Sequence, residues 1–206
     1  MKIGIIGAGF IGRALASVSV KLGHDVMVSN SRGPGTLFSL MGTLGVKVGT
    51  VAEAAAFGDI VVIAIPFSAY VSLPPEPLKD KIVVDANNYY SQRDGNVAAL
   101  DSKSTTTSQM LAAHLTDSRV VKAFNAIVAH DIEGDGQPAG SPNRRAHPIA
   151  GDDAAAKAEV TTLIEQIGFD VVDAGELAEG WRFQAGTPAY CVRLDIAELK
   201  SALAAA

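Results

Sequence analysis

Three glycines near the amino terminus have the spacing of a phosphate-binding turn. Gly7, Gly9 and Gly12 form the pattern G-x-G-x-x-G. In such a turn the first glycine permits a sharp strand-to-helix reversal, the second lets a pyrophosphate approach the backbone, and the third lets the helix pack closely on the strand. The apolar spacing on either side predicts a strand over residues 2–6 and a helix over 10–22. Because strand, turn and helix come in the required order, the sequence predicts a dinucleotide-binding site.

The second predicted strand, residues 25–29, indicates which dinucleotide binds. A strand that binds NAD usually ends near an Asp or Glu, which binds a ribose hydroxyl. Here no carboxylate occurs between residues 26 and 52, and Arg32 follows the strand. The planar guanidinium of an arginine is suited to binding a 2′-phosphate. We therefore predict NADP(H), with Arg32 on the phosphate and with Asn30, Ser31 and Thr36 adding hydrogen bonds.

The elements that must position these residues alternate between strands and helices. Residues 59–65, 81–85 and 120–124 are apolar runs rich in β-branched residues, as in strands buried on both faces of a parallel sheet. Helices are predicted over 36–44, 50–57, 108–115, 153–167 and 192–203, and further strands over 46–48, 147–151 and 170–174. This order predicts an α/β fold, a Rossmann doubly wound parallel sheet with a small C-terminal α/β part packed on it.

The same patterns suggest how the chain is divided. We expect an NADP-binding Rossmann domain over residues 1–133, a loop over 134–147 that is rich in Gly and Pro, and a small C-terminal part over 148–206. The last part is too short for an independent core. The apolar helix predicted at its end needs a surface to pack on, so we also predict a homodimer.

Composition excludes several classes of protein. The net charge of −5 leaves no basic surface for nucleic acid. Glycines and Arg13 interrupt the apolar N-terminal stretch, unlike a signal peptide, and no apolar run is long enough to cross a membrane. A cytoplasmic protein is predicted. The single Cys191 and the scattered histidines give no metal-binding spacing.

The sequence indicates the hydride acceptor less clearly than it indicates the cofactor. No Tyr-x-x-x-Lys pair occurs, and no catalytic residue or proton donor for a carbonyl substrate is apparent. Transfer to a flavin-like ring demands less of the protein, because the ring and the nicotinamide only need to stack in a dry site. Its walls should come from the carboxyl ends of the central strands. These ends supply Ala64, Ile65, Pro66, Asn87, Phe124 and Asn125.

Several short stretches, taken together and in order, resemble one family. They are IGIIGAGFIG at 3–12, NSR at 30–32, AIP at 64–66, DANNYY at 85–90, VKAFN at 121–125, IAGDD at 149–153 and GFDVVD at 168–173. The set is similar to the deazaflavin-dependent NADP oxidoreductases, which include the reductases of coenzyme F420, an 8-hydroxy-5-deazaflavin. It is also similar to the cytosolic domain of the STEAP metalloreductases.

This resemblance implies hydride exchange between NADPH and a flavin-like ring, which is a deazaflavin, FMN or FAD. It implies that NADP is bound by Gly7, Gly9, Phe10, Ile11, Ser31 and Arg32. It also implies that Ala64, Ile65 and Pro66 line the nicotinamide and that Asn87 and residues 123–125 lie close to it. For the phosphate and polyglutamyl tail of a deazaflavin coenzyme, the only candidates are Arg144 and Arg145. Two alternatives stay open. One is an NADPH-dependent reductase of a small imine, carbonyl or enone, and the other is an NADP-binding redox sensor that regulates a partner.

Overall fold

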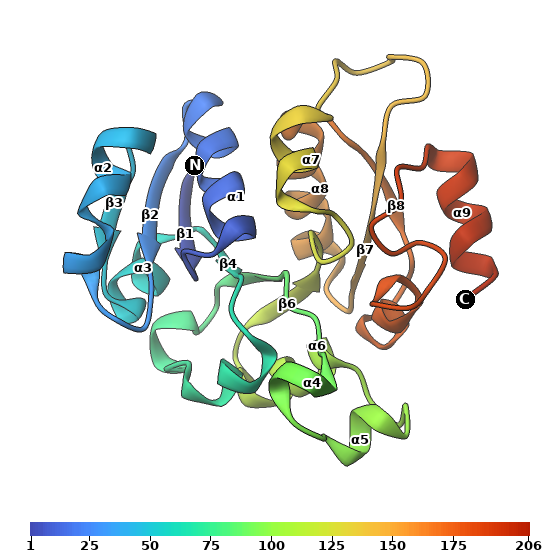
Figure 1. The fold of residues 1–206 in the computed structure, drawn as a ribbon, viewed down its shortest axis with the longest axis horizontal. Coiled ribbons are helices and arrows are strands. Elements are labelled where there is room, and N and C mark those ends of the chain that lie inside the picture. The colour runs from blue at the N-terminus through green and yellow to red at the C-terminus, as the bar shows by residue number, and fades with distance from the viewer.

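An eight-stranded sheet runs through the computed structural model, which describes residues 1–206 (Figure 1). The strand order is β3-β2-β1-β4-β5-β6-β7-β8. The strands are β1 (Lys2–Ile6), β2 (Asp25–Ser29), β3 (Lys47–Gly49), β4 (Ile60–Ile63), β5 (Ile82–Asp85), β6 (Arg119–Lys122), β7 (Ala146–Gly151) and β8 (Asp170–Asp173). Every neighbouring pair is parallel except β6 and β7. The order reverses between β1 and β4, where such sheets bind their ligands.

Helices cover both faces of the sheet. One face carries α1 (Phe10–Lys21), α2 (Phe38–Leu44), α7 (Ala129–Gly134) and α8 (Ala154–Ile167), and the other carries α3 (Val51–Phe57) and α6 (Thr107–His114). The remaining helices are α4 (Ser91–Asp94), α5 (Ala98–Asp101) and α9 (Ile196–Ala204), with 3-10 turns at Pro34–Leu37, Phe67–Ser72, Glu76–Leu78 and Leu177–Phe183. None of these helices has the length and apolarity needed to cross a membrane.

The strands are buried on both faces because their alternate side chains enter different cores. Ile3 and Ile5 of β1 pack in a large cluster with α1, while Ile6 packs in a second cluster with α3 and α6. Successive strand residues point to opposite faces, so an unbroken apolar run fills both clusters. The Rossmann-type α/β fold expected from these runs is confirmed.

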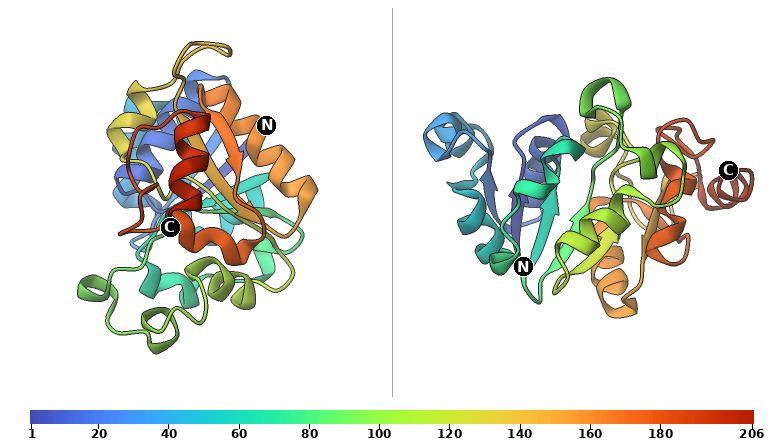
Figure 2. Two further views of the ribbon diagram at one scale, coloured as in Figure 1. Left: turned by 90° about the vertical axis from the view of Figure 1, so that its right-hand side faces the viewer. Right: turned by 90° about the horizontal axis from the view of Figure 1, so that it is seen from below.

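The C-terminal part continues the sheet. Strand β7 pairs with β6, and Ile149 and Phe169 lie in the same large cluster as Ile3. A third cluster, which includes Leu199 and Leu203 of α9, packs on the outer side of β7 and β8; α9 faces the viewer in the left panel of Figure 2. The two parts therefore share one core.

Three local expectations were wrong. Helix α7 lies just before and at the start of the predicted loop and was not foreseen, because six residues are too few to show a helical period. The terminal helix begins at Ile196 instead of 192, because Asp195 caps it by accepting a hydrogen bond from the Glu198 N–H. The short helices α4 and α5 were missed for the same reason as α7.

Candidate functional site

The glycine turn joins β1 to α1 as the spacing predicts. Gly7 has φ of 116°, and a Cβ added there would lie 2.1 Å from the Ala64 carbonyl oxygen. A Cβ on Gly12 would lie 1.9 Å from the Gly7 carbonyl oxygen, so Gly12 lets α1 pack against the turn. Gly9 has no atom within 4 Å of such a Cβ. Since no side chain caps α1 and its first turn holds no acidic residue, its N–H groups are free to bind an anion.

A cavity of about 340 Å³ lies beside this turn. Its lining joins the turn to the residues that follow β2, and we call it the nucleotide cavity; Gly7, Gly9, Asn30, Ser31, Arg32 and Ala64–Pro66 are among its walls. Asn30 accepts a hydrogen bond from the Arg32 N–H at 2.9 Å and donates one to Thr36 Oγ1 at 2.9 Å. Thr36 does not line the cavity and shapes the loop instead. The exposed Arg32 side chain makes no ion pair or hydrogen bond of its own.

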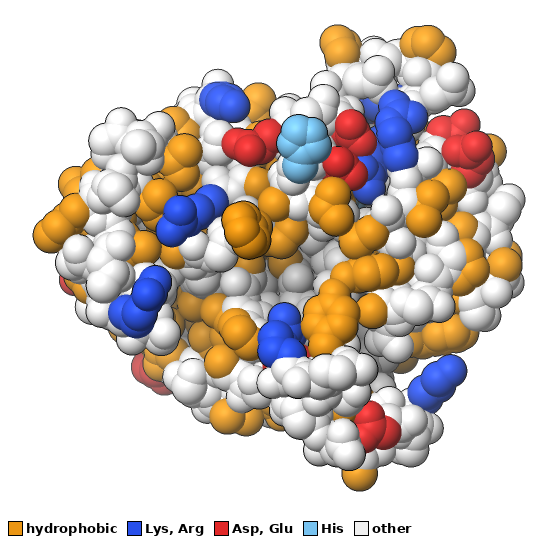
Figure 3. Space-filling model, in the orientation of Figure 1, with side chains coloured by type: hydrophobic (Ala, Val, Ile, Leu, Met, Phe, Trp, Pro, Cys, Tyr) orange, Lys and Arg blue, Asp and Glu red, His pale blue; other side chains and the backbone are white.

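A second cavity of about 600 Å³, which we call the acceptor cavity, adjoins the first. The two cavities share Gly9 and residues 64–66. The residues predicted as walls of the hydride-transfer site all line it, namely Ala64, Ile65, Pro66, Asn87, Phe124 and Asn125, together with Phe10 and Ile11. The face drawn in Figure 3 is hollowed at its centre, and hydrophobic side chains border the hollow.

The lining of both cavities lacks carboxylates. Arg32 lies in the nucleotide cavity, and Arg93 and His130 lie in the acceptor cavity, but no Asp or Glu lines either. The chain as a whole carries a net charge of −5. Asp94, which pairs with Arg93, and the buried Asp85 lie behind this lining. A lining without carboxylates favours a ligand that carries phosphates.

A buried ion pair supports the floor of the acceptor cavity. Lys122 and Asp85 are each 1% exposed, and Lys122 Nζ lies 3.7 Å from Asp85 Oδ2. Burial lowers the pKa of the Lys122 ammonium, and the Asp85 carboxylate opposes that shift. Both residues hold Asn87, because its N–H donates to Asp85 at 3.0 Å and its carbonyl accepts from Lys122 at 3.2 Å. The pair thus fixes the chain where β5 leaves the sheet.

Two tyrosines on the wall of the acceptor cavity were not foreseen. The hydroxyl groups of Tyr90 and Tyr190 are in hydrogen-bond contact, although the residues are 100 positions apart. Burial raises the pKa of the Tyr190 phenol well above its usual range, and the bond to Tyr90 acts in the same direction. Tyr90 ends the DANNYY stretch, which gave it no role of its own, and Tyr190 lies in none of the stretches that carry the resemblance.

Arg144 and Arg145 do not reach either cavity. Arg144 donates to Asp170 at 2.7 Å, and Arg145 donates to Asp131 and Asp135 at 2.7 and 2.8 Å. Both side chains are buried, and their charges are neutralised inside the chain, by Asp170 of β8 for Arg144 and by Asp131 and Asp135 at α7 for Arg145. Their suggested role toward an acidic tail is wrong.

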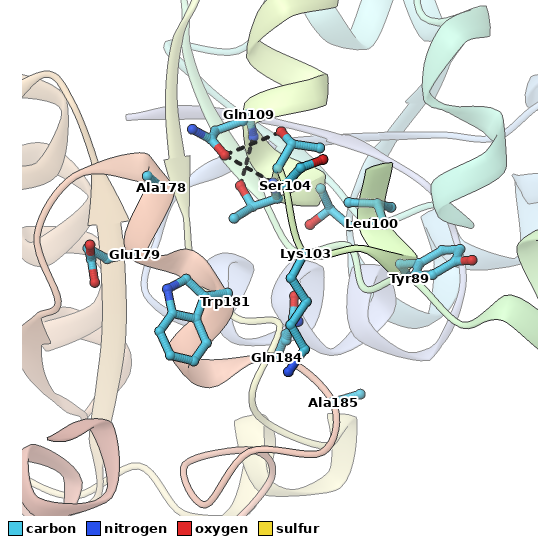
Figure 4. Close-up of a pocket in the computed structure, with 13 residues that line it drawn as sticks. Tyr89, Leu100, Lys103, Ser104, Gln109, Ala178, Glu179, Trp181, Gln184 and Ala185 are labelled. Atoms are coloured by element: carbon cyan, nitrogen blue, oxygen red, sulfur yellow. Dashed lines mark hydrogen bonds between the residues drawn. The ribbon is translucent and has the colours of Figure 1, made fainter. Parts of the chain in front are cut away.

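A further cavity of about 590 Å³ lies between α6 and the Leu177–Phe183 turn (Figure 4). Tyr89, Lys103, Trp181 and Gln184 are among its walls. It contains none of the predicted site residues. The glycine turn, the β2 loop and the ends of β4, β5 and β6 converge elsewhere, on the two adjoining cavities.

Known proteins are similar to this chain in sequence and in fold. Residues 2–89 match the family model described as NADP oxidoreductase, coenzyme F420-dependent. The structure of the hypothetical protein SMa0349 from Sinorhizobium meliloti has a TM-score of 0.81 and 29% identity, with 94% of each chain covered. The proposed F420-dependent NADP reductase from Arthrobacter sp. FB24 has a TM-score of 0.74 and 28% identity, with 85% of each chain covered.

A curated relative extends the match beyond the first 89 residues. Metalloreductase STEAP3 of Rattus norvegicus is 30% identical over 186 residues, which are 89% of this chain. The chain spans only 36% of that protein's length. The resemblance expected from the motifs is confirmed: the chain is similar to the NADP-dependent oxidoreductases of the coenzyme F420-dependent family, whose model its residues 2–89 match.

Proposed function

We propose that this protein transfers a hydride between NADP(H) and a flavin-like ring, a deazaflavin of the coenzyme F420 type or FMN or FAD. The observation that carries the proposal is the junction of the two cavities at residues 64–66. One cavity has the features of a nucleotide site, and the other is a largely apolar space that opens directly from it. Bound NADPH would supply the hydride at this junction.

The chain's own residues fit the nucleotide. Free N–H groups at the start of α1 suit the pyrophosphate, and Gly9 leaves the backbone open to it. Arg32 has no internal partner, so its guanidinium is available to a 2′-phosphate. Asn30 holds the Arg32 backbone in place through its side-chain oxygen.

The acceptor cavity fits a flat ring. Ala64, Pro66 and Ile127 give it small or apolar walls, and such walls exclude water from the reacting atoms. Phe10 stands at its rim with 87% of its surface exposed, which is unusual for a phenylalanine. A stacked ring would cover that surface.

The first experiment measures NADPH oxidation at 340 nm, with NADH as the control cofactor. Coenzyme F420, FMN, FAD, riboflavin and a ferric chelate are each offered alone. NADPH-selective turnover with F420 or a flavin would support the proposal and identify the ring. Turnover with a small imine, carbonyl or enone in the absence of any flavin would overturn it in favour of the organic-substrate alternative. Tight NADPH binding without turnover of any acceptor would favour the redox sensor.

The cytoplasmic location and the homodimer expected from the sequence stay predictions. The proposed reaction depends on neither of them, because both cavities are formed within a single chain.

A further inference from the structure

Tyr90 and Tyr190 form a hydroxyl pair on the wall of the acceptor cavity. No proton donor for this site could be recognised from the sequence alone. Each side chain is partly exposed, and both line the cavity. Their oxygens contact each other. One phenol of such a pair can donate to its partner while the other donates to a ligand, because each hydroxyl has one proton and two lone pairs.

The surroundings hold Tyr90 in place. Its N–H donates to Asp94 at 3.0 Å, and the Arg93 guanidinium lies 4.9 Å from the centre of its ring. Arg93 is itself tied to the Asn88 carbonyl at 2.7 Å. The phenol is therefore oriented before any ligand binds.

The chain beside Tyr190 adopts a conformation that costs energy. Cys191 has φ of 55°, in the left-handed region that residues other than glycine rarely adopt, and Phe124 in the same cavity has φ of 59°. Such backbone costs about 1–3 kcal/mol per residue and clusters at functional sites. The Cys191 N–H donates to the Ala126 carbonyl at 3.2 Å, which anchors the strained turn to the segment that follows β6. This left-handed residue directly follows Tyr190, whose side chain lines the cavity.

We propose that Tyr190 is the proton donor of the site and that Tyr90 returns a proton to it. This inference rests on the proposed function. The hydride that leaves NADPH carries an electron pair to the acceptor, and the displaced pair of the acceptor's double bond moves to a ring nitrogen. Tyr190 Oη gives its proton to that nitrogen, so that NADPH is oxidised and the acceptor gains one hydride and one proton. Tyr90 then reprotonates Tyr190 and takes a proton from water at the cavity mouth.

Burial and the bond to Tyr90 raise the pKa of the Tyr190 phenol, so its hydroxyl keeps its proton at neutral pH until a ligand binds. General acids of this kind contribute about 10²–10⁴-fold to a rate.

The test compares wild type with Tyr190→Phe, Tyr90→Phe and the control Tyr70→Phe. Tyr70 stacks on Phe67 outside both cavities. Fluorescence titrations give the Kd of NADPH and of F420 or FMN, and single-turnover mixing in H₂O and D₂O gives the transfer rate. We expect Tyr190→Phe to leave the NADPH Kd unchanged, to raise the acceptor Kd about 10-fold through one lost hydrogen bond and to slow transfer about 100-fold. We expect a solvent isotope effect on the transfer rate of wild type and none on that of Tyr190→Phe.

Tyr90→Phe should keep the acceptor Kd within a few-fold and slow repeated turnover more than the first turnover. An unchanged NADPH Kd shows that a variant is folded, so loss of activity cannot be attributed to misfolding. If wild type transfers hydride and Tyr190→Phe matches it in rate and in acceptor Kd, the proton-donor role is wrong. If wild type transfers hydride to no ring acceptor, the proposed function fails instead.

Discussion

The backbone N–H of Ile65 donates a hydrogen bond to the side-chain oxygen of Asn87 at 3.0 Å. Ile65 follows β4 and Asn87 follows β5, so this bond ties two strand ends together where the cavities meet. Asn87 is in turn held by Asp85 and Lys122 beneath it. A chain of polar contacts therefore runs from a buried ion pair to the surface along which the nicotinamide is expected to lie.

Replacing Arg32 tests the preference for NADP. Arg32→Ala should raise the NADPH Kd about 10- to 100-fold, because a charge-assisted hydrogen bond contributes about 1.5–3 kcal/mol. The NADH Kd should change less than 2-fold, since NADH has no 2′-phosphate. Titrations of both cofactors measure this, with the exposed Lys47→Ala as control. An equal loss for both cofactors would contradict the role of Arg32.

Two glycines of one turn should behave differently on substitution. Gly7→Ala forces a Cβ onto the Ala64 carbonyl at positive φ and should cost at least about 2 kcal/mol of stability. Gly9→Ala places its Cβ in open space, so the protein should keep its Tm and lose only NADPH affinity. Thermal unfolding and NADPH titration separate the two effects. If Gly9→Ala binds NADPH with the same Kd as wild type, the pyrophosphate does not bind against Gly9.

Replacing one member of the buried Lys122–Asp85 ion pair should cost more stability than replacing both members with apolar residues. Lys122→Ala leaves Asp85 buried without its partner and should destabilise the fold by about 3–5 kcal/mol. The double variant Lys122→Met with Asp85→Leu should recover much of this loss. Lys47→Ala, which breaks the exposed pair with Asp25, should cost less than about 1 kcal/mol. Urea unfolding measures these variants together with the single variants Lys122→Met and Asp85→Leu. If the losses of the two single variants add up to that of the double variant, the two residues are not coupled.

His147 should make the fold sensitive to acid. It lies between Phe124 and Phe169, and burial lowers its pKa to about 3, with the nearby Arg145 charge as a second cause. In the unfolded chain it takes up a proton below about pH 6.5. Between these two values the unfolded state binds more protons, so stability falls as the pH falls.

The size of this effect follows from the shift. Lowering the pH from 7 to 5 should cost about 2 kcal/mol from His147 alone, at about 1.4 kcal/mol per pH unit below the unfolded pKa. His147→Leu should remove that part of the acid sensitivity, whereas the exposed His130→Leu should retain it. Urea midpoints at pH 5 and pH 7 provide the comparison. The same loss of stability in His147→Leu as in wild type would show that other groups cause it.

Sedimentation tests the predicted homodimer. Leu199 and Leu203 of α9 are buried in the chain's own third cluster, so they need no partner. Val192 and Ile196 remain 48% and 39% exposed beside them, and the prediction now rests on these two residues. A dimer at micromolar concentration is expected, and Ile196→Glu should dissociate it. A monomeric wild type would contradict the prediction.

Local patterns in the sequence determined the glycine turn, the central strands and the absence of an acid after β2. Each of these depends on residues close together in the chain, where hydrophobic period and turn chemistry act directly. The walls of the acceptor cavity were also predictable, because the carboxyl ends of parallel strands meet at one edge of a sheet.

Only the tertiary structure decided how distant segments meet. It brought Tyr190 to Tyr90, paired Arg144 with Asp170 of β8 and Arg145 with Asp131 of α7, and joined the C-terminal part to the sheet through the antiparallel β7. A lone tyrosine or arginine has no periodic signal, and its partner is set by packing over long sequence separations. The proton donor proposed here therefore emerged only when the chain was folded.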